Sequence, residues 1–148
     1  MRLEIMRRSD IALRAVRLLH REAATLRAAE IAARLESTAQ FIPQVLTPLV
    51  KAGWIASEPG PRGGYRLTIE PSRRSILELV ELIEGPTDNG VCVLRAGPCA
   101  SDARCSLHDA WSAGRDALLR RLADEPVSPV PKKRSRKMTA SSVKERNR

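Results

Sequence analysis

Apolar residues recur at helical spacing near the start of the chain. From Asp10 to Leu19 they fall on one face of a helix, and Ser9 just before them is a residue type that caps helix N-termini. A second, shorter helix is predicted at Ala28–Leu35. One face of the first helix therefore belongs to the core of a folded domain.

A third helix follows a short polar break. Glu36, Ser37 and Thr38 form the break, and the last two are good N-cap residues. Apolar positions from Phe41 to Val50 then repeat at helical spacing, and Gly53 stands where a helix commonly ends on a left-handed residue. Two helices joined by a short polar turn predict a helix-turn-helix.

Two short strands are predicted directly after the third helix. They are Trp54–Ser57 and Tyr65–Ile69, and the proline and glycine residues of Pro59–Gly64 between them exclude regular structure. A helix-turn-helix followed by a hairpin is the order of a winged helix. In that fold the third helix enters the major groove of DNA, and the hairpin lies against the backbone or the minor groove.

A fourth helix and a long polar stretch follow the hairpin. Ser75 and Glu78 have the spacing of a capping box at the start of this helix, and Gly85 ends it. The stretch from residue 86 to about residue 106 contains glycine and proline and carries no helical or strand pattern.

A last helix is predicted from about Leu107 to Ala123. Its apolar stripe consists of Leu107, Trp111, Gly114, Leu118 and Leu122. Gly114 costs about 1 kcal/mol relative to alanine but lets two helices approach closely. The stripe is therefore a candidate seam between two copies of the chain, and packing on the first helix is the alternative.

Charge along the chain indicates a nucleic-acid partner. Residues 1–74 hold 13 basic and 7 acidic side chains and residues 126–148 hold 8 and 1, whereas residues 75–125 hold 5 and 9. Clustered lysine and arginine neutralise phosphates, so nucleic acid is the leading partner, and solubility alone is the alternative. The 148 residues suit one domain with an appendage and exclude a large multidomain enzyme.

Neither end of the chain predicts a membrane segment. No apolar run approaches the roughly 20 residues that span a bilayer, and residues 1–8 lack the apolar segment of a signal peptide. We therefore expect a cytoplasmic protein with no membrane partner. Residues 126–148 have little to bury and are predicted to form a disordered basic tail, which either adds nonspecific DNA affinity or is a solvated end, with contact to an anionic membrane surface as the lesser alternative.

All three cysteines lie in or at the end of the polar stretch. Cys92, Cys99 and Cys105 are an odd number, so a disulfide framework is not expected. Three thiolates that converge on one point suit zinc or an iron–sulfur cluster. The gaps of six and five residues are looser than a zinc knuckle, which favours an iron–sulfur cluster over zinc, with a thiol–disulfide pair third.

His108 follows the third cysteine by three residues. A histidine at a helix start is often solvated or capping, but its nearness to Cys105 makes it equally a candidate ligand. His20 has no comparable neighbours and is expected to be structural or solvent-facing.

Several stretches stand in a specific order along residues 1–123. They are Met1-Arg-Leu3, Ala29-Glu-Ile-Ala32, Leu49-Val-Lys-Ala-Gly-Trp-Ile55, Gly63-Gly-Tyr65, and the cysteine series that ends in Cys105-Ser-Leu-His108-Asp-Ala-Trp111. Together with the winged helix, this order resembles the IscR/NsrR family (Rrf-type) of bacterial iron–sulfur transcription regulators.

The resemblance implies a homodimer that binds a roughly palindromic double-stranded DNA operator through two winged helices. It also implies a 2Fe–2S or 4Fe–4S cluster held by Cys92, Cys99 and Cys105. The fourth ligand in such proteins is either the histidine after the third cysteine, here His108, or a carboxylate on the first helix of the partner subunit, here Asp10. We prefer His108, because local chelation needs no precise dimer geometry.

Seven residues are candidates for DNA contact. Those at the start of the third helix reach phosphates or base edges, and those further along reach phosphates or solvent. A residue at the hairpin tip is placed to enter the minor groove. In chain order the seven are Ser37, Thr38, Gln40, Gln44, Thr47, Lys51 and Arg62.

The sequence departs from the family pattern in three places. The first cysteine gap is six residues where five is more usual, and Glu36 stands where the turn usually has glycine. Pro43 and Pro48 lie within the third helix, and an interior proline removes a backbone hydrogen bond. We therefore expect this helix to begin late and be kinked, or to be presented differently to DNA.

The predicted fold is mainly α with a small β-hairpin. It comprises a winged helix-turn-helix at residues 1–85, a cluster-binding loop at 86–106, a dimerisation helix at 107–125 and the basic tail at 126–148. The expected function is a DNA-binding transcriptional regulator switched by an iron–sulfur cluster that senses redox state, nitric oxide or iron–sulfur status. The alternative is a winged-helix regulator with a zinc site or a thiol–disulfide switch in the same loop.

An enzyme that acts on a small molecule is not expected. The sequence has no close Cys-x-x-Cys, no phosphate loop and no paired catalytic groups.

Overall fold

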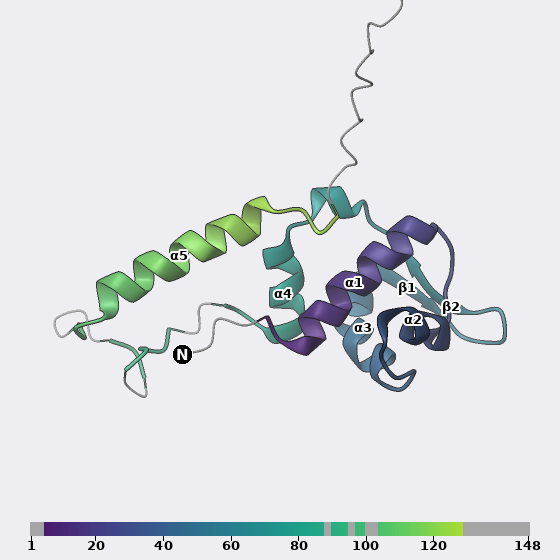
Figure 1. The fold of residues 1–148 in the computed structure, drawn as a ribbon, viewed down its shortest axis with the longest axis horizontal. Helices are drawn as coiled ribbons and strands as arrows, with labels where there is room; N and C mark the ends of the chain where they lie inside the picture. The colour runs from purple at the N-terminus through teal and green to yellow at the C-terminus, as the bar shows by residue number, and fades with distance from the viewer. Residues whose placement is uncertain (1–4, 88–89, 95–96, 100–103, 129–148) are drawn as a thin grey trace, which may run out of the picture.

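The computed structural model describes residues 5–87, 90–94, 97–99 and 104–128. Its mainly helical fold with one small hairpin is the one that the sequence predicts (Figure 1). In chain order the elements are α1 (Arg7–Glu22), α2 (Ala28–Leu35), α3 (Phe41–Lys51), β1 (Ile55–Glu58), β2 (Gly64–Leu67), a 3₁₀ turn η1 (Pro71–Arg73), α4 (Ile76–Glu84) and α5 (His108–Asp124). We call residues 7–84 the head, and we call α5 together with the described residues of the cysteine loop the arm.

The head is built around one apolar core. α1 packs against α2, α3, α4 and β2, and α3 also packs against α4 and β1. The centre of this core is fully enclosed and includes Val16, Leu19, Ile31, Ile42, Leu46 and Leu49. Because α3 contributes buried residues at helical spacing, one face of it is fixed to the core while the opposite face is left to solvent.

The hairpin is tied to the chain between α1 and α2. β1 and β2 run antiparallel with Ile55 opposite Leu67, and Leu26 exchanges two backbone hydrogen bonds with Tyr65 at 3.0 and 2.8 Å. Gly64 has φ +151°, and a Cβ there would press against the Leu26 backbone. Only glycine fits this close approach, which explains the Gly-Gly-Tyr stretch.

α1 begins one turn earlier than the sequence suggests. Its N-cap is Met6, and Ser9 lies inside the first turn, so Ser9 does not cap the helix. The Ser9 side chain is 1% exposed, and its hydroxyl donates a hydrogen bond to the Glu84 carboxylate at the end of α4. A long-range contact therefore replaces the predicted local one.

The two prolines of α3 are accommodated without a late start to the helix. Pro43 is the third residue of α3, within the first turn, where backbone N–H groups have no partner inside the helix. Pro48 lies in the interior and cannot donate to the carbonyl of Gln44, four residues earlier. That carbonyl oxygen instead accepts a hydrogen bond from Arg8 Nη2 at 3.4 Å. The helix thus continues to Lys51, and Gly53 follows with φ +75°, as predicted.

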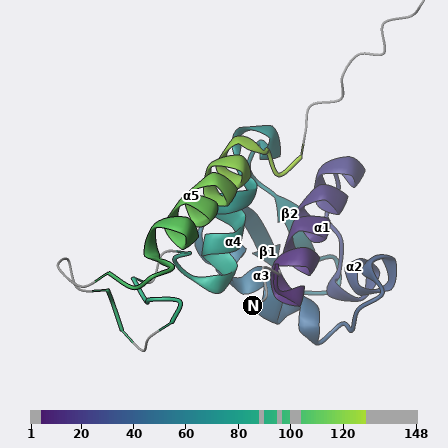
Figure 2. The ribbon, with the colours of Figure 1, turned by 60° about the vertical axis from the view of Figure 1, so that its left-hand side comes forward.

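α5 extends away from the head and packs along α4 (Figures 1 and 2). The predicted alternative of packing on the first helix is therefore replaced by packing on α4. No residue of α5 is buried by this contact. Along the predicted stripe, Leu107, Gly114 and Leu118 are exposed, and Trp111 and Leu122 are half-buried.

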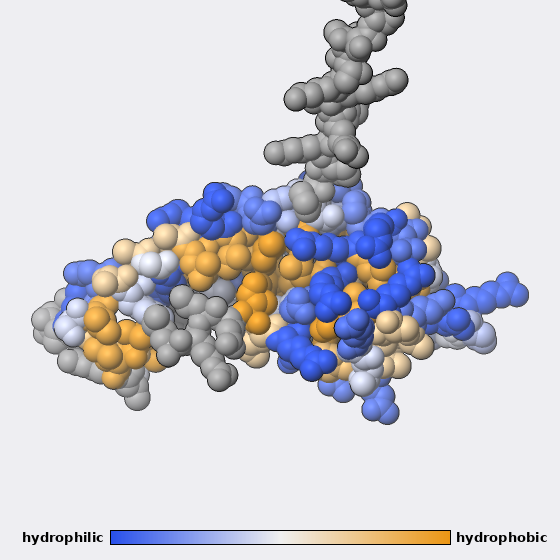
Figure 3. Space-filling view, in the orientation of Figure 1, coloured by the Kyte–Doolittle hydropathy of each residue, from blue (hydrophilic) through white to orange (hydrophobic). Residues whose placement is uncertain are grey.

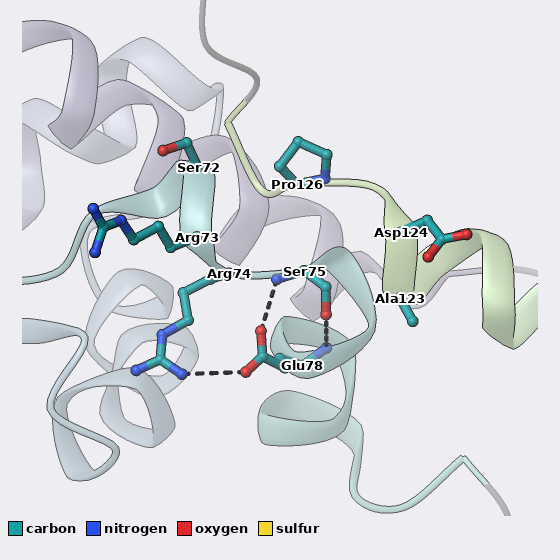
Figure 4. A pocket seen from close by; sticks show the side chains of 8 residues that line it. All are labelled: Ser72, Arg73, Arg74, Ser75, Glu78, Ala123, Asp124 and Pro126. Carbon is teal, nitrogen blue, oxygen red and sulfur yellow. Dashed lines mark hydrogen bonds and ion pairs between the residues drawn. The ribbon is translucent and has the colours of Figure 1, made fainter.

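The end of the arm returns to the head. Val127 is 0% exposed, its N–H donates to the Arg74 carbonyl oxygen at 2.8 Å, and its own carbonyl oxygen accepts from Arg17 Nε at 2.6 Å. Figure 4 shows Pro126 beside Ser72 at this junction. The residues up to 128, which the sequence assigns to the tail, therefore belong to the folded domain. The remainder of the predicted tail, 129–148, lies outside the described residues.

Within the described part of the chain, none of the helices has the length and apolar character needed to cross a membrane.

Candidate metal centre and nucleic-acid interface

Three thiols converge beside the start of α5. The Sγ atoms of Cys92, Cys99 and Cys105 all lie within 4.8 Å of one another, and those of Cys92 and Cys105 are 3.5 Å apart. Cys105 is buried and the other two are half-buried. The Cys92 N–H donates to the Gly97 carbonyl oxygen at 2.8 Å, which folds the loop back on itself, and the Leu94 N–H donates to Cys92 Sγ at 3.4 Å. The loop thus gathers the three sulfurs, as their clustering in the sequence predicts.

The electrostatics of this group suit a bound cation. A backbone hydrogen bond from Cys105 lowers the pKa of Cys99, but hydrogen bonds with the Cys92 and Cys105 thiols, desolvation and the charge of Cys105 together raise it above its ordinary value. The neighbouring thiols therefore oppose ionisation of Cys99. A metal ion or cluster would offset this repulsion, because metal ligation requires the thiolate form. Soft thiolates are the donors of zinc and iron–sulfur centres, so the donor set fits either.

The two candidate fourth ligands lie in different elements. His108 is the first residue of α5 and half-buried, and its N–H donates to the Cys105 carbonyl oxygen at 3.0 Å. Asp10 is exposed on α1, where it forms an ion pair with Arg14 at 3.6 Å. Among the described residues, the close group of possible ligand atoms holds the three sulfurs and includes neither His108 nor Asp10.

The solvent-facing side of α3 carries most of the predicted DNA contacts. Its residues are all exposed and, apart from the adjacent pair Pro43 and Gln44, follow one another at spacings of three or four from the N-cap onward. We call them the outer face of α3: Gln40, Pro43, Gln44, Thr47 and Lys51. Ser37, half-buried, and Thr38, exposed, precede it in the turn after α2. All of these residues except Pro43 are candidates for DNA contact from the sequence, and their contacts remain predictions.

Arg62 lies in the loop between β1 and β2 and is exposed. This loop projects past α2 at one end of the molecule (Figure 1). The head therefore presents the turn, the outer face of α3 and the hairpin tip, the three parts that a winged helix uses to contact a duplex.

Comparison of the sequence with models of known protein families identifies the family of this chain. The model of the Rrf2 family, described as an iron-dependent transcriptional regulator, matches residues 5–128. The chain belongs to the Rrf2 family. This result confirms the family resemblance found in the sequence, and the members of this family are DNA-binding transcriptional regulators and not enzymes.

The curated relatives of this Rrf2-family chain include several regulators named IscR. The HTH-type transcriptional regulator IscR of Aliivibrio salmonicida is 30% identical over 93 residues, which cover 63% of this chain and 55% of that protein. IscR of Vibrio atlanticus is 32% identical over 93 residues, covering 63% and 53%. The chain thus spans about half the length of the curated relatives it matches.

Solved structures share the fold at lower identity. CymR of B. subtilis, the global cysteine regulator, has a TM-score of 0.68 at 23% identity, covering 85% of this chain and 94% of that one. IscR of T. potens has a TM-score of 0.66 at 19% identity, covering 84% and 83%. The oxidized form of Staphylococcus aureus CymR has a TM-score of 0.64 at 21% identity, covering 84% and 93%. The Rrf2 fold therefore extends over the arm as well as the head.

Sequence reasoning missed the role of Glu84 in this Rrf2-family chain. Glu84 Oε1 accepts hydrogen bonds from the Ser9 hydroxyl and, at 3.1 Å, from the Met6 N–H. Glu84 ends α4, and the cysteine loop starts just beyond it. An acidic residue at a helix C-terminus is unfavourable because it lies beside the negative end of the helix dipole. This position could have indicated from the sequence that the Glu84 carboxylate has a specific hydrogen-bond donor.

Proposed function

We propose that this Rrf2-family regulator holds an iron–sulfur cluster through Cys92, Cys99 and Cys105, and that the state of the cluster sets its affinity for an operator. The observation that carries the proposal is the convergence of the three Sγ atoms within 4.8 Å. Similarity to regulators named IscR supports it. Oxidation or loss of a bound cluster would change the charge and the ligand geometry at the start of α5.

The fourth ligand in this proposal is His108. Its position at the N-terminus of α5, one turn after Cys105, lets a local movement of the helix bring the ring toward the sulfurs. Asp10 of the partner subunit is the alternative ligand. Metal analysis of His108→Ala and Asp10→Asn variants distinguishes the two.

The regulator acts in this proposal as a homodimer on a palindromic operator. The exposed Leu107 and Leu118 of α5 supply the apolar contact between two copies, and each head reads one half-site. Ser37, Thr38, Gln40, Gln44, Thr47 and Lys51 contact the major groove and its phosphates, and Arg62 enters the minor groove. The domain division predicted from the sequence is retained, with the end of the folded part moved to residue 128.

In this proposal, the start of α1 connects the base of the cysteine loop to the DNA-contacting helix α3. Glu84 connects the base of the cysteine loop to Ser9 and Met6, and the neighbouring Arg8 donates to the Gln44 carbonyl oxygen on α3. A cofactor changes DNA affinity only if it binds one arrangement of the heads more tightly than another. A loop that reorders on loading would shift α1 against α3 through these contacts.

Anaerobic reconstitution with iron and sulfide tests the proposal. We expect stoichiometric iron and sulfide, a visible chromophore, and operator affinity that differs at least about fivefold between loaded and metal-free protein, since allosteric coupling is typically 1–3 kcal/mol. Cys99→Ala should abolish both the chromophore and the difference in affinity. Ser106→Ala, an exposed change in the same segment, is the matched control and should preserve both. A full chromophore in Cys99→Ala would remove the loop from the mechanism.

A thiol–disulfide switch is the second candidate, because Cys92 Sγ and Cys105 Sγ lie 3.5 Å apart and a small movement would bring them within bonding distance. Hydrogen peroxide would oxidise the two thiols to a disulfide, taking up two electrons and two protons and leaving as two water molecules. This candidate predicts that metal-free protein changes DNA affinity on peroxide treatment and recovers with dithiothreitol. Stoichiometric zinc without a chromophore would favour a zinc site instead.

A further inference from the structure

The outer face of α3 has an unusual chemistry for a surface that contacts DNA. Between Gln40 and Thr47 its exposed residues are two glutamines, a proline and a threonine, and its first charged residue is Lys51, in the last turn. Gln40 is the N-cap residue, and its side chain makes no capping hydrogen bond, so the amide is not committed to the helix end. This face therefore offers neutral groups to the base edges.

Thr47 presents mainly its methyl group. Its hydroxyl donates to the Pro43 carbonyl oxygen at 2.7 Å, which commits the donor to the helix backbone. Pro43 is exposed and has neither an N–H nor a polar side-chain atom. The sequence of groups along this part of the face is thus amide, apolar, amide, apolar.

Base edges in the major groove distinguish such groups. Guanine is read by arginine or lysine at O6 and N7, and cytosine by a carboxylate that accepts from N4. Adenine pairs bidentately with glutamine or asparagine, and the C5-methyl group of thymine is read by apolar contact. From Gln40 to Thr47 the outer face carries the amide and apolar groups that read adenine and thymine. It carries none of the cationic or carboxylate groups that read guanine and cytosine.

The basic side chains near this part of α3 are not placed to read guanine. Arg8 approaches α3 from α1, but its guanidinium already donates to the Gln44 carbonyl oxygen. Arg62 lies at the tip of the hairpin, on the part of a winged helix that reaches the minor groove. A narrow minor groove, typical of A-tracts, attracts arginine side chains. Lys51, in the last turn of α3, is placed for a phosphate.

We infer that each head reads a run of A·T base pairs in the major groove of its half-site, with Gln40 and Gln44 on adenines and Pro43 and Thr47 on thymine methyl groups. The stretch from Gln40 to Thr47 rises about 10 Å along the helix axis, which matches about three base pairs at roughly 3.4 Å each. The inference rests on the DNA-binding function proposed above and adds which bases the operator presents.

Selection from a random duplex library with the full chain, both cluster-loaded and metal-free, provides the first test. We expect A·T pairs at about three successive positions of each half-site. Gln44→Ala should relax the preference at one of them, and Pro43→Glu should shift selection toward cytosine. Selected G·C pairs across these positions would overturn the inference and leave the DNA-binding function intact. No enrichment in either cofactor state would instead contradict the proposed function.

Replacing thymine by deoxyuridine in the selected operator removes only the C5-methyl groups and cannot affect folding of the protein. Each contacted methyl should be worth about fourfold in affinity by fluorescence anisotropy. The variant Thr47→Ser keeps the hydroxyl at position 47 and removes its methyl group, so it should lower the preference for the thymine duplex by about the fourfold of one contacted methyl. Lys51→Ala is the control, which should weaken both duplexes by the same factor. Equal affinity of the unaltered protein for the two duplexes would refute the methyl contacts.

Discussion

The head and the arm of this chain are stabilised in different ways. The head encloses a continuous core from four helices and the hairpin, whereas α5 has no buried residue. Among the described residues, the exposed large apolar side chains are absent from α2, α3, α4 and the hairpin, and they are Ile5, Met6, Val91, Val93, Leu94, Leu107 and Leu118. Figure 3 shows the same contrast, with apolar surface in the trough between α5 and α4 and polar surface over much of the head.

This contrast distinguishes apolar side chains that the chain buries within its own fold from apolar side chains that a partner could cover. The head buries its large apolar side chains in one core, to which Val127 from beyond α5 also contributes. The arm displays exposed leucines and two half-buried thiols. Large exposed apolar side chains that lie together mark interaction surfaces, so the arm is the part of the chain that a partner would cover.

The largest effect that tests this contrast is a cavity in the head. Leu46 is 0% exposed on α3, and Leu46→Ala should lower the free energy of unfolding by about 3 kcal/mol, because it removes buried methyl groups and leaves a cavity. Leu118 on the arm is 42% exposed, and Leu118→Ala should change the unfolding of the monomer by no more than about 0.5 kcal/mol.

Urea denaturation of both variants, with sedimentation to follow association, is the measurement for this pair. We expect Leu118→Ala to weaken self-association instead of folding. Equal destabilisation by the two substitutions would mean that head and arm share one core.

A smaller effect is expected where the arm is joined to the head. Val127 is fully enclosed in the core although it follows α5, and Val127→Ala should cost about 2 kcal/mol from two lost methyl groups and the cavity. Amide hydrogen exchange should report faster exchange at residues 125–128 and 74–76, which share backbone hydrogen bonds. Val93→Ala is the exposed control in the arm, and comparable exchange in the two variants would argue against a fixed junction.

A still smaller effect is expected from removing a serine hydroxyl that donates to a glutamate carboxylate, and it should depend on whether the hydroxyl is buried or exposed. Ser9→Ala removes a buried hydroxyl that donates to Glu84, and it should cost about 1 kcal/mol. Ser72→Ala removes an exposed hydroxyl that donates to Glu70 at 2.8 Å, and it should cost less than about 0.5 kcal/mol.

Operator affinity of the loaded and metal-free forms extends this serine comparison. Ser9→Ala should also reduce the difference in affinity between the two forms, because Ser9 links α1 to the base of the cysteine loop. Ser72→Ala should leave that difference unchanged. A full difference in Ser9→Ala would place the link elsewhere.

Local pattern predicted the elements but not the contacts between distant residues. The helical spacing of apolar positions, Gly53 and the Ser75 capping box located helices correctly, because each depends on neighbours in sequence. Ser9 looked like a cap because its type favours that role, yet its partner Glu84 is 75 residues away. Val127 looked like part of a polar tail because proline and lysine surround it, and its partner Arg17 is 110 residues away.

The candidate site divides in the same way. Convergence of the three cysteines was predictable from their clustering within one short loop. The partner of α5 was not, because an amphipathic stripe does not say which surface covers it. The preference for His108 over Asp10 stays a prediction, since the second of these ligands would come from another subunit.

The smallest expected effect concerns the N-termini of α4 and α5, which differ as head and arm do. At α4 the Ser75 hydroxyl accepts from the Glu78 N–H at 3.1 Å, and Glu78 accepts from the Ser75 N–H at 2.7 Å and pairs with Arg74 at 3.2 Å (Figure 4). At α5 the N-cap Leu107 provides no side-chain hydrogen bond. The backbone hydrogen bond from Ser75, followed by the pairing with Arg74, lowers the pKa of Glu78.

A lowered pKa in the folded state means that ionised Glu78 stabilises the head above the unfolded pKa of about 4.3, and that this contribution is lost as the pH falls through the folded value. Because solvent screens the half-exposed carboxylate, Glu78→Gln should cost only about 0.5 kcal/mol at pH 7 and almost nothing at pH 2. Urea denaturation across this range measures it, with Asp124→Asn as the control for net charge on the arm. A cost of Glu78→Gln that is the same at both pH values would show that the amide caps α4 as well as the carboxylate does.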